Sequence, residues 1–375
     1  MNRSVDVSSK LTSGGAHVSC LALSALLLCG GVRTVLAQGC IASRGSGVTF
    51  CQQGGQRVGD ASMPPSVGFQ AAVSYRWLHS DRMFSGDVEQ TQREADGSQD
   101  INDSHFIDVG ITYAFTPRWS ATFTVPFSVQ DRSQVVRALN AQRTILARFH
   151  TQASGLGDVR LEGNGWLLDP TEHPRGNVLF GLGIAAPTGD RDTQDVFLVP
   201  SLPKPRPQLH AVDQSIQPGN GGWGVVLNFF AYRQLAPRWL GFVNGNYTLT
   251  PEEKYTPTAS LSGDYSIADS YLARGGFEFV LAPQYGVTLN LAGRIDGVPV
   301  RDVIGGSTGF RRPGYAVSLE PGISWMNKSW SVSVNTPVAL YRNRLASLDD
   351  LAADQPPAAA GFTDFLITAS ISKRF

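Results

Sequence analysis

The residues from Ser66 to Trp77 alternate without a break between larger apolar side chains and mostly small or polar ones. Because successive side chains of a β-strand point to opposite faces, this period of two predicts one extended strand. Strands of soluble proteins usually have five or six residues, whereas a tilted strand needs about 9–11 to cross a bilayer. The length of the alternation therefore favours a membrane-spanning strand over a strand of a soluble sandwich.

The same alternation recurs to the end of the chain, although it is weaker in two segments. We predict twelve strands, at 66–77, 105–115, 119–130, 156–168, 177–188, 222–233, 238–250, 270–281, 286–297, 314–325, 330–341 and 362–375.

The connections between these segments sort by length. Short connections lie at 116–118, 169–176, 235–237, 282–284 and 326–328, and long polar ones lie at 79–103, 131–154, 189–221, 251–269, 298–313 and 342–361. A meander with short turns on one side and long loops on the other is typical of outer-membrane barrels. We predict an all-β, up-and-down antiparallel transmembrane β-barrel of about 12 strands, with short periplasmic turns and long extracellular loops.

The composition agrees with this fold but does not select it. Charged residues make up 17% of the chain, and Lys and Arg (31) balance Asp and Glu (31), so no basic excess indicates nucleic-acid binding. Beyond residue 37 no apolar run approaches the roughly 18 residues of a membrane helix.

The N-terminus has the three parts of a secretory signal peptide. Arg3 and Lys10 precede an apolar stretch at 18–32, and small or apolar residues precede a cut near Ala37. A membrane anchor is the alternative, and its core would be short. We therefore predict a signal peptide at 1–37, a periplasmic segment at 38–65 and a barrel at 66–375 in the outer membrane of a Gram-negative cell.

Cys40 and Cys51 remain after signal removal and lie in a Gly-rich stretch. Two nearby cysteines in an oxidising compartment usually pair, so we predict a Cys40–Cys51 disulfide. Metal binding would require further ligands, and no His or Asp lies between them.

Aromatic residues and prolines mark the strand ends. Trp119, Trp239 and Trp330 each begin a strand after a short turn, as expected of an aromatic girdle at the membrane interface. Pro126 and Pro337 each follow a Trp by seven residues. Because proline cannot donate to a ladder, we expect both near the extracellular rim, where the strands loosen.

The chain ends on an alternating strand whose last residue is Phe375. This combination resembles the signal that the barrel-insertion machinery reads. Lys373 is less usual near that end, and it can extend its ammonium group to the interface.

The second face of the predicted strands points into the barrel and carries charges of both signs. These could line a permeation path, or they could pair across a closed interior. The candidate lumen-lining residues are Arg76, Asp108, Arg160, Glu162, Arg274, Glu278, Arg294 and Glu320.

The sequence gives no support for an enzyme, a cofactor or a metal. No HExxH segment is present, and the segment at 305–309, which matches G-x-S-x-G, lies in the predicted long polar connection 298–313. Membrane phospholipases of similar barrel form carry a His with a Ser two residues later, whereas His105 is followed there by Ile107.

Two short motifs resemble a known family. Gly155, Gly157 and Asp158 belong to a GLGD segment, and a PTGD segment follows at Pro187, Thr188, Gly189 and Asp190. This pair is similar to outer-membrane proteins grouped as the MetA-pathway phenol-degradation family. The resemblance implies a monomeric outer-membrane channel, with aromatic or other small hydrophobic molecules as the solutes that the family name suggests.

The leading interpretation is therefore passive passage of small molecules through an outer-membrane channel. One alternative is a non-conducting barrel whose extracellular loops bind partners, and a less favoured one is a barrel hydrolase. The expected partners are outer-membrane lipid, the insertion machinery and a small-molecule solute, with no nucleic acid.

Overall fold

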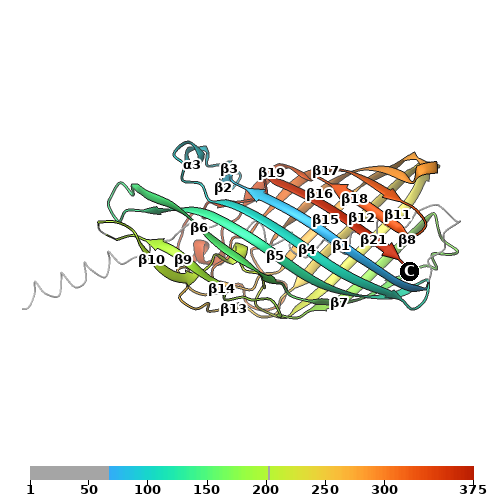
Figure 1. The fold of residues 1–375 in the computed structure, drawn as a ribbon, viewed down its shortest axis with the longest axis horizontal. Helices are drawn as coiled ribbons and strands as arrows, with labels where there is room; N and C mark the ends of the chain where they lie inside the picture. The colour runs from blue at the N-terminus through green and yellow to red at the C-terminus, as the bar shows by residue number, and fades with distance from the viewer. Residues whose placement is uncertain (1–66, 202) are drawn as a thin grey trace, which may run out of the picture. The chain divides into compact units, whose positions relative to one another are not determined.

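The computed structural model describes residues 67–201 and 203–375. They form a closed antiparallel barrel of twelve staves, where a stave is one position in the wall (Figure 1). β1 (Gly68–Ser80) pairs with β21 (Phe365–Arg374), which closes the barrel. The predicted fold is confirmed. The signal peptide and the Cys40–Cys51 disulfide lie outside the described residues.

Ten staves are single strands, and two consist of consecutive segments. The broken staves are β6 (Ile145–Leu156) with β7 (Arg160–Trp166), and β18 (Trp330–Asn335) with β19 (Val338–Arg344). Besides β1 and β21, the single strands are β4 (Ile101–Ala114), β5 (Trp119–Arg137), β8 (Gly176–Ala185), β11 (Gly224–Ala236), β12 (Trp239–Leu249), β15 (Ser270–Ala282), β16 (Val287–Val298) and β17 (Gly314–Met326).

The remaining elements are short and lie mainly in the long loops. None of the helices in the described part of the chain has the length and apolar character needed to span a membrane. The short elements are β2 (Met83–Ser85), β3 (Val88–Glu89), α3 (Thr91–Ala95), β9 (Gln194–Val199), β10 (Arg206–Ala211), η1 (Gln214–Ile216), β13 (Lys254–Tyr255), β14 (Tyr265–Ser266), η2 (Pro283–Tyr285), α4 (Leu348–Ala352) and β20 (Ala360–Gly361).

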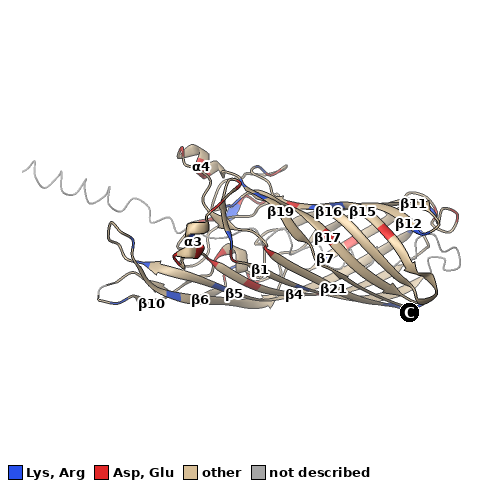
Figure 2. Ribbon diagram, turned by 90° about the horizontal axis from the view of Figure 1, so that it is seen from above, with Lys and Arg blue, Asp and Glu red and all other residues tan. Residues whose placement is uncertain are grey.

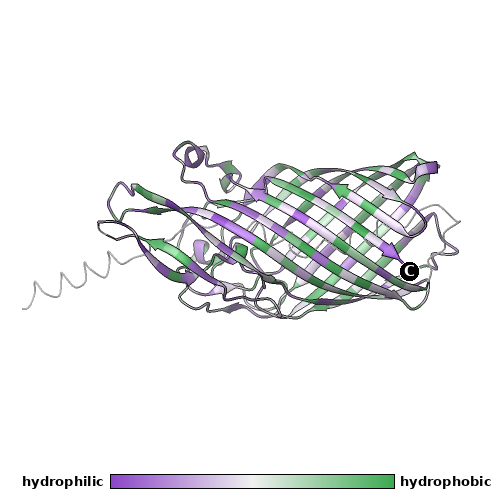
Figure 3. Cartoon of the chain, in the orientation of Figure 1, coloured by the Kyte–Doolittle hydropathy of each residue, from purple (hydrophilic) through white to green (hydrophobic). Residues whose placement is uncertain are grey.

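The period of two in the sequence becomes the two faces of the wall. Apolar side chains such as Phe123 and Leu182 are exposed on the outside, whereas alternate residues such as Arg76 are buried on the inside. Figure 3 shows hydrophobic and hydrophilic residues alternating along the strands. Exposed apolar side chains over the whole wall fit a surface that contacts lipid.

One predicted loop is wrong. Residues 131–154 are largely strand, because β5 continues to Arg137 and β6 begins at Ile145. The outward positions here include Asp131, His150 and Gln152, so the apolar half of the alternation is largely replaced by polar residues. In Figure 1, β5 and β6 extend beyond the other strands of the barrel wall at the long-loop end, beside β9 and β10, and outward polar side chains there suit water.

The two prolines lie at interruptions of pairing, as predicted, but not at the rim. Pro337 lies in the break between β18 and β19, in the middle of a stave. Pro126 lies within β5, opposite the break between β6 and β7. The rim position is therefore wrong: each proline marks a mid-wall break in the ladder.

The short-turn end carries the predicted tryptophans. Trp119, Trp239 and Trp330 begin β5, β12 and β18, and their side chains are exposed on the outer surface. At the same end the backbone N–H of Phe375 donates to the carbonyl of Phe69 at 2.9 Å. The last residue therefore lies beside the first strand, at the seam of the barrel.

Candidate functional site

All eight predicted interior residues occupy inward-facing positions. Arg76, Asp108, Glu162, Arg294 and Glu320 are buried, and Arg160, Arg274 and Glu278 are half-buried. Figure 2 shows charged residues scattered along the strands as single sites. The register between strands also places the half-buried residues on the inner face. Arg160 lies opposite Thr124 and Glu278 lies opposite Leu240, and Thr124 and Leu240 are both buried.

Arg76 and Asp108 form one interior ion pair between neighbouring strands. Arg76 Nη2 lies 2.9 Å from Asp108 Oδ2, and both side chains are almost fully buried. The guanidinium also lies 5.2 Å from the centre of the Phe106 ring. A buried charge is stable only when a partner compensates its loss of water, and this pair meets that condition within the wall.

Glu320 is the centre of a second, larger network. Its carboxylate pairs with Arg274 and, at 3.4 Å, with Arg294. Arg294 also pairs with Asp296 at 2.8 Å, and Arg274 donates to Asn244 Oδ1 at 3.0 Å. The network links four consecutive staves, from β12 to β17.

Glu162 takes part in an amide network instead. Its Oε2 accepts from Asn228 Nδ2 at 2.7 Å, and Asn228 Oδ1 accepts from Asn246 Nδ2 at 2.6 Å. These three strand networks connect adjacent or next-but-one staves. The polar side chains therefore pair along the wall, and the expectation of pairing across the interior is not met by these contacts.

An apolar patch on the inner wall was not predicted. It groups Trp166, Leu179, Phe230, Tyr232, Leu240, Phe242 and Ala292, all buried. The ring of Trp166 meets those of Phe230 and Tyr232 edge-on, at centroid distances of 6.1 and 5.8 Å. The signal available in the sequence was Phe229-Phe230, where both faces of one strand are aromatic.

The long-loop end of the interior is occupied by the chain itself. Residues 210–219 are buried, and Val212, Ser215, Ile216 and Gln217 are completely so. Gln130 Nε2 donates to the carbonyl of Ile216 at 3.0 Å, and the Tyr265 hydroxyl donates to that of Val212 at 2.9 Å. This segment, which we call the inner loop, folds inward within the predicted long loop 189–221.

Charged side chains fix the inner loop. Asp213 lies 3.6 Å from Arg312, and nearby Arg132 pairs with Asp100 at 2.8 Å. Burial raises the pKa of Asp100, with Arg132 opposing, and burial lowers the pKa of Arg312 to about 9. The cost of burying these charges makes their mutual arrangement specific.

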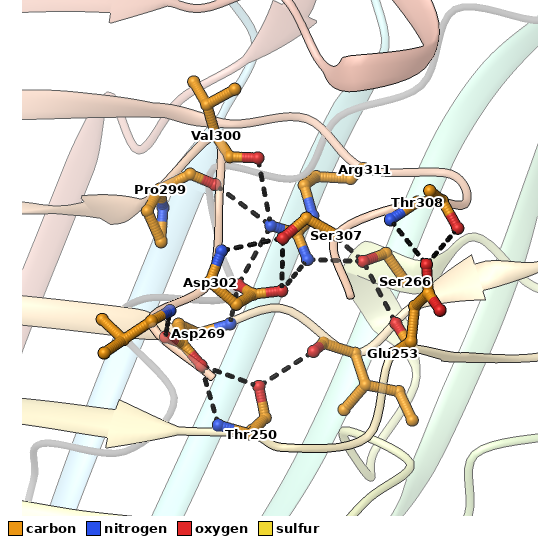
Figure 4. Close-up of polar contacts among 12 residues, drawn as sticks. Thr250, Glu253, Ser266, Asp269, Pro299, Val300, Asp302, Ser307, Thr308 and Arg311 are labelled. Carbon is orange, nitrogen blue, oxygen red and sulfur yellow. Dashed lines mark hydrogen bonds and ion pairs between the residues drawn. The ribbon is translucent and has the colours of Figure 1, made fainter. Parts of the chain in front are cut away.

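A further polar network joins the loop before β15 to the loop after β16 (Figure 4). Arg311 pairs with Asp302, and neither side chain has any exposed surface. The guanidinium also donates to the Ser266 hydroxyl at 2.7 Å, and the backbone N–H of Asp269 donates to Asp302 at 2.8 Å. Loops 251–269 and 298–313 are thus held together around one buried guanidinium.

The two family-like motifs meet at the break between β6 and β7. Asp158 accepts from the backbone N–H of Gly189 at 3.0 Å and from that of Asn220 at 2.7 Å. The Thr188 hydroxyl accepts from the N–H of Val159 at 2.9 Å and donates to the Gly157 carbonyl at 3.1 Å.

Glycines are required where these motifs touch. A Cβ on Gly189 would lie 2.6 Å from Gly219 Cα and 2.9 Å from the backbone of Gly157. The backbone N–H of Gly219 donates to the Asp190 carbonyl at 2.7 Å, and a Cβ on Gly155 would lie 3.6 Å from Pro218 Cγ. The two motifs therefore meet at one junction of three chain segments, which we call the wall junction.

A small cavity of about 60 Å³ lies beside the wall junction. Its lining includes Phe106, Pro126, Asp158, Arg160 and Pro218. The cavity can hold water-sized molecules but is too small for a ligand.

No group of three or more potential metal ligands occurs among residues 67–201 and 203–375. His105 is an exposed outward residue whose Nδ1 lies 2.7 Å from the Tyr75 hydroxyl, and Asp103 lies 3.4 Å from its Nε2. This arrangement lies on the outer surface, away from the interior networks.

The fold and the inward polar face define the class: a transmembrane β-barrel of the outer-membrane type. The comparison of folds agrees. The chain is similar to the COG4313 outer membrane channel from Pseudomonas putida F1, at 14% identity and a TM-score of 0.53, over 84% of this chain and 98% of that one.

Two other solved barrels align less closely. The β domain of the Bordetella autotransporter BrkA has 12% identity and a TM-score of 0.42, over 83% of this chain and 100% of that one. The P. putida toluene transporter TodX has 10% identity and a TM-score of 0.41, over 82% and 90%. No family model and no curated protein sequence matches the chain, so the phenol-degradation resemblance stays a prediction.

Proposed function

We propose that this protein is a monomeric outer-membrane channel for passive passage of small molecules that carry an apolar or aromatic group. It would reach the membrane after signal-peptide cleavage near Ala37 and insertion through the terminal strand that ends at Phe375. In this orientation the short turns face the periplasm and the long loops face the outside.

The observation that carries the proposal is the aromatic inner patch. Trp166, Phe230, Tyr232 and Phe242 face inward, although an aqueous pore needs no such surface. The interior charges of Arg76 and Asp108 and of the Glu320 network are paired along the wall, so they place little uncompensated charge on the path. Glu278, which lies opposite Leu240 of the patch, has no ion pair in the described part of the chain. An aromatic surface beside satisfied polar groups suits solutes that are apolar in part.

The test compares two solutes that differ only in a ring. Lipid vesicles containing the purified full chain are exposed to phenyl β-glucoside or methyl β-glucoside, and entry is followed by osmotic swelling. We expect Phe230→Leu to lower the ratio of phenyl to methyl entry severalfold. Phe229→Leu changes the adjacent residue on the outward face, and it should leave the ratio unchanged.

A second candidate function is a non-conducting barrel whose loops bind partners. The buried inner loop and the Arg311 network favour it, because both occupy the long-loop end. If the folded protein gives neither swelling nor conductance in planar bilayers, the channel proposal is overturned and this second function is supported. A hydrolase assay with His105→Ala as the control addresses the enzyme alternative.

A further inference from the structure

The outer surface of the barrel carries a groove near its short-turn end. The groove has a cavity volume of about 1120 Å³, and it lies between the 168–178 turn and β15. Its floor is formed mainly by outward residues of β8, β11, β12 and β15, namely Gly176, Val178, Ala231, Gly241, Val243 and Gly275.

The register explains why the surface is hollow there. Ala231 lies opposite Val178 on one side and Val243 on the other, and Val243 lies opposite Gly275. Larger side chains border these positions, with Leu235 and Phe277 both exposed. Small residues on adjacent strands thus form an apolar groove in a surface that otherwise presents large side chains to lipid.

One end of the groove is basic. Arg233 lies on the outward face of β11, and both of its cross-strand partners, Gly176 and Gly241, are glycines. Arg175 also lines this end, with His173 and a single carboxylate, Glu172. In the described part of the chain the guanidiniums of Arg233 and Arg175 have no hydrogen-bond or ion-pair partner.

We propose that this groove binds one glycerophospholipid, with an acyl chain along the apolar floor and the phosphodiester at Arg233 and Arg175. An outward guanidinium beside an apolar surface needs an anionic partner, and planar guanidinium groups match phosphate oxygens well. A second copy of the chain would bring the same basic end into the interface without supplying a phosphate. Charge complementarity therefore favours lipid over self-association.

The inference rests on the proposed function for one point only, the orientation in which the short turns face the periplasm. It requires no conduction, so the two proposals fail independently: loss of swelling leaves lipid retention unaffected, and absence of lipid leaves swelling unaffected.

The experiment is native mass spectrometry of the full chain in detergent, titrated with dioleoylphosphatidylglycerol. We expect one lipid to bind at least tenfold more tightly than the next. Arg233→Gln should weaken that first binding about tenfold, and its matched control is Arg238→Gln, an exposed arginine that is not part of the groove lining.

A second variant fills the apolar floor. A Cβ on Gly275 would lie 3.4 Å from Val243 Cγ2, an ordinary contact, so the backbone accepts a side chain there, and the outward face directs that of Gly275→Leu into the groove. Gly293 lies opposite Gly275 on β16 and outside the groove lining, so Gly293→Leu is the matched control. We expect the first variant to abolish tight binding and the second to retain it.

Three outcomes would overturn the proposal. The wild type could bind successive lipids with equal affinity, the control variants could lose binding as fully as the test variants, or lipid-free dimers could form through this face. Heat-modifiable gel mobility of every variant confirms that the barrel is folded, so that a loss of lipid reports on the groove.

Discussion

Asp158 accepts a 2.7 Å hydrogen bond from the backbone N–H of Asn220, which lies 62 positions further along the chain. Its other carboxylate oxygen accepts from the N–H of Gly189. One side chain therefore fixes both ends of the segment that contains the inner loop. Hydrogen bonds to a charged acceptor contribute about 1.5–3 kcal/mol each, so this residue is a strong restraint.

The first prediction concerns that restraint. Asp158→Asn leaves one oxygen to accept and puts an NH₂ group against a backbone N–H, so one of the two bonds is lost. We expect faster proteolysis within 189–223 and larger or noisier single-channel conductance. Asp169→Asn, in a short turn at the other end, is the control; equal effects of both variants would show that Asp158 has no special role.

The wall junction should not tolerate a methyl group. In Gly189→Ala the new Cβ meets backbone atoms of Gly219 and Gly157 at 2.6–2.9 Å, and backbone cannot move as a side-chain end can. Overpacking of this kind costs about 1–3 kcal/mol. We expect a lower temperature for loss of heat-modifiable mobility. Gly163→Ala has its nearest contact at 3.8 Å and should match the wild type.

The interior network predicts a stability effect at Glu320. Glu320→Gln leaves Arg274 and Arg294 without the carboxylate they share. Removing one partner of a buried ion pair costs about 3–5 kcal/mol, because a charge is left in a poorly solvated place. The measurement is the urea midpoint of the barrel in detergent, with Glu94→Gln on the exposed helix α3 as the control. Unchanged midpoints in both variants would contradict the role given to the network.

The β13–β14 hairpin should open in acid. The Thr256 hydroxyl and then Lys254 hold the pKa of Asp264 below its ordinary value. A lowered folded pKa means that the stabilisation is present above the ordinary aspartate pKa of about 4 and is lost as the pH falls through the lowered value. Hydrogen exchange across 254–266 should therefore accelerate below about pH 4. Thr256→Val should bring the pKa of Asp264 closer to its ordinary value, so the variant should lose less hairpin protection on acidification than the wild type does; an equal loss in both would refute the assignment.

The wall of the barrel could be predicted from the sequence because lipid on one side imposes a strict period of two. Residues such as Val109, Phe123 and Leu291 have no other reason to alternate so regularly, and their faces are confirmed. The same reasoning missed residues 131–154, because the outward positions of β5 and β6 there carry polar residues such as Asp131 and His150, as expected of strands that extend beyond the lipid. The alternation of apolar and polar residues arises from contact with lipid, so it is lost where a strand extends beyond the lipid.

The interior was predicted only by face. The inward positions of Arg76, Asp108 and Glu320 follow from parity, but their partners depend on the register between strands distant in sequence. The aromatic patch was not predicted, because its members lie on several strands and meet only through the register between those strands. The inner loop was also beyond reach, since its burial depends on contacts with Gln130 and Tyr265 that no local pattern encodes.

At the break between β6 and β7, residues of a long connection form part of the barrel wall. Surface loops usually accept inserted residues, because few contacts are lost when their chain is lengthened. The tip at 139–142 fits that description and should accept an epitope tag. Residues 218–220 do not, because Pro218, Gly219 and Asn220 complete the wall where the strand is interrupted. An engineer who uses this barrel as a display scaffold should therefore insert sequences at 139–142 and leave residues 218–220 unchanged.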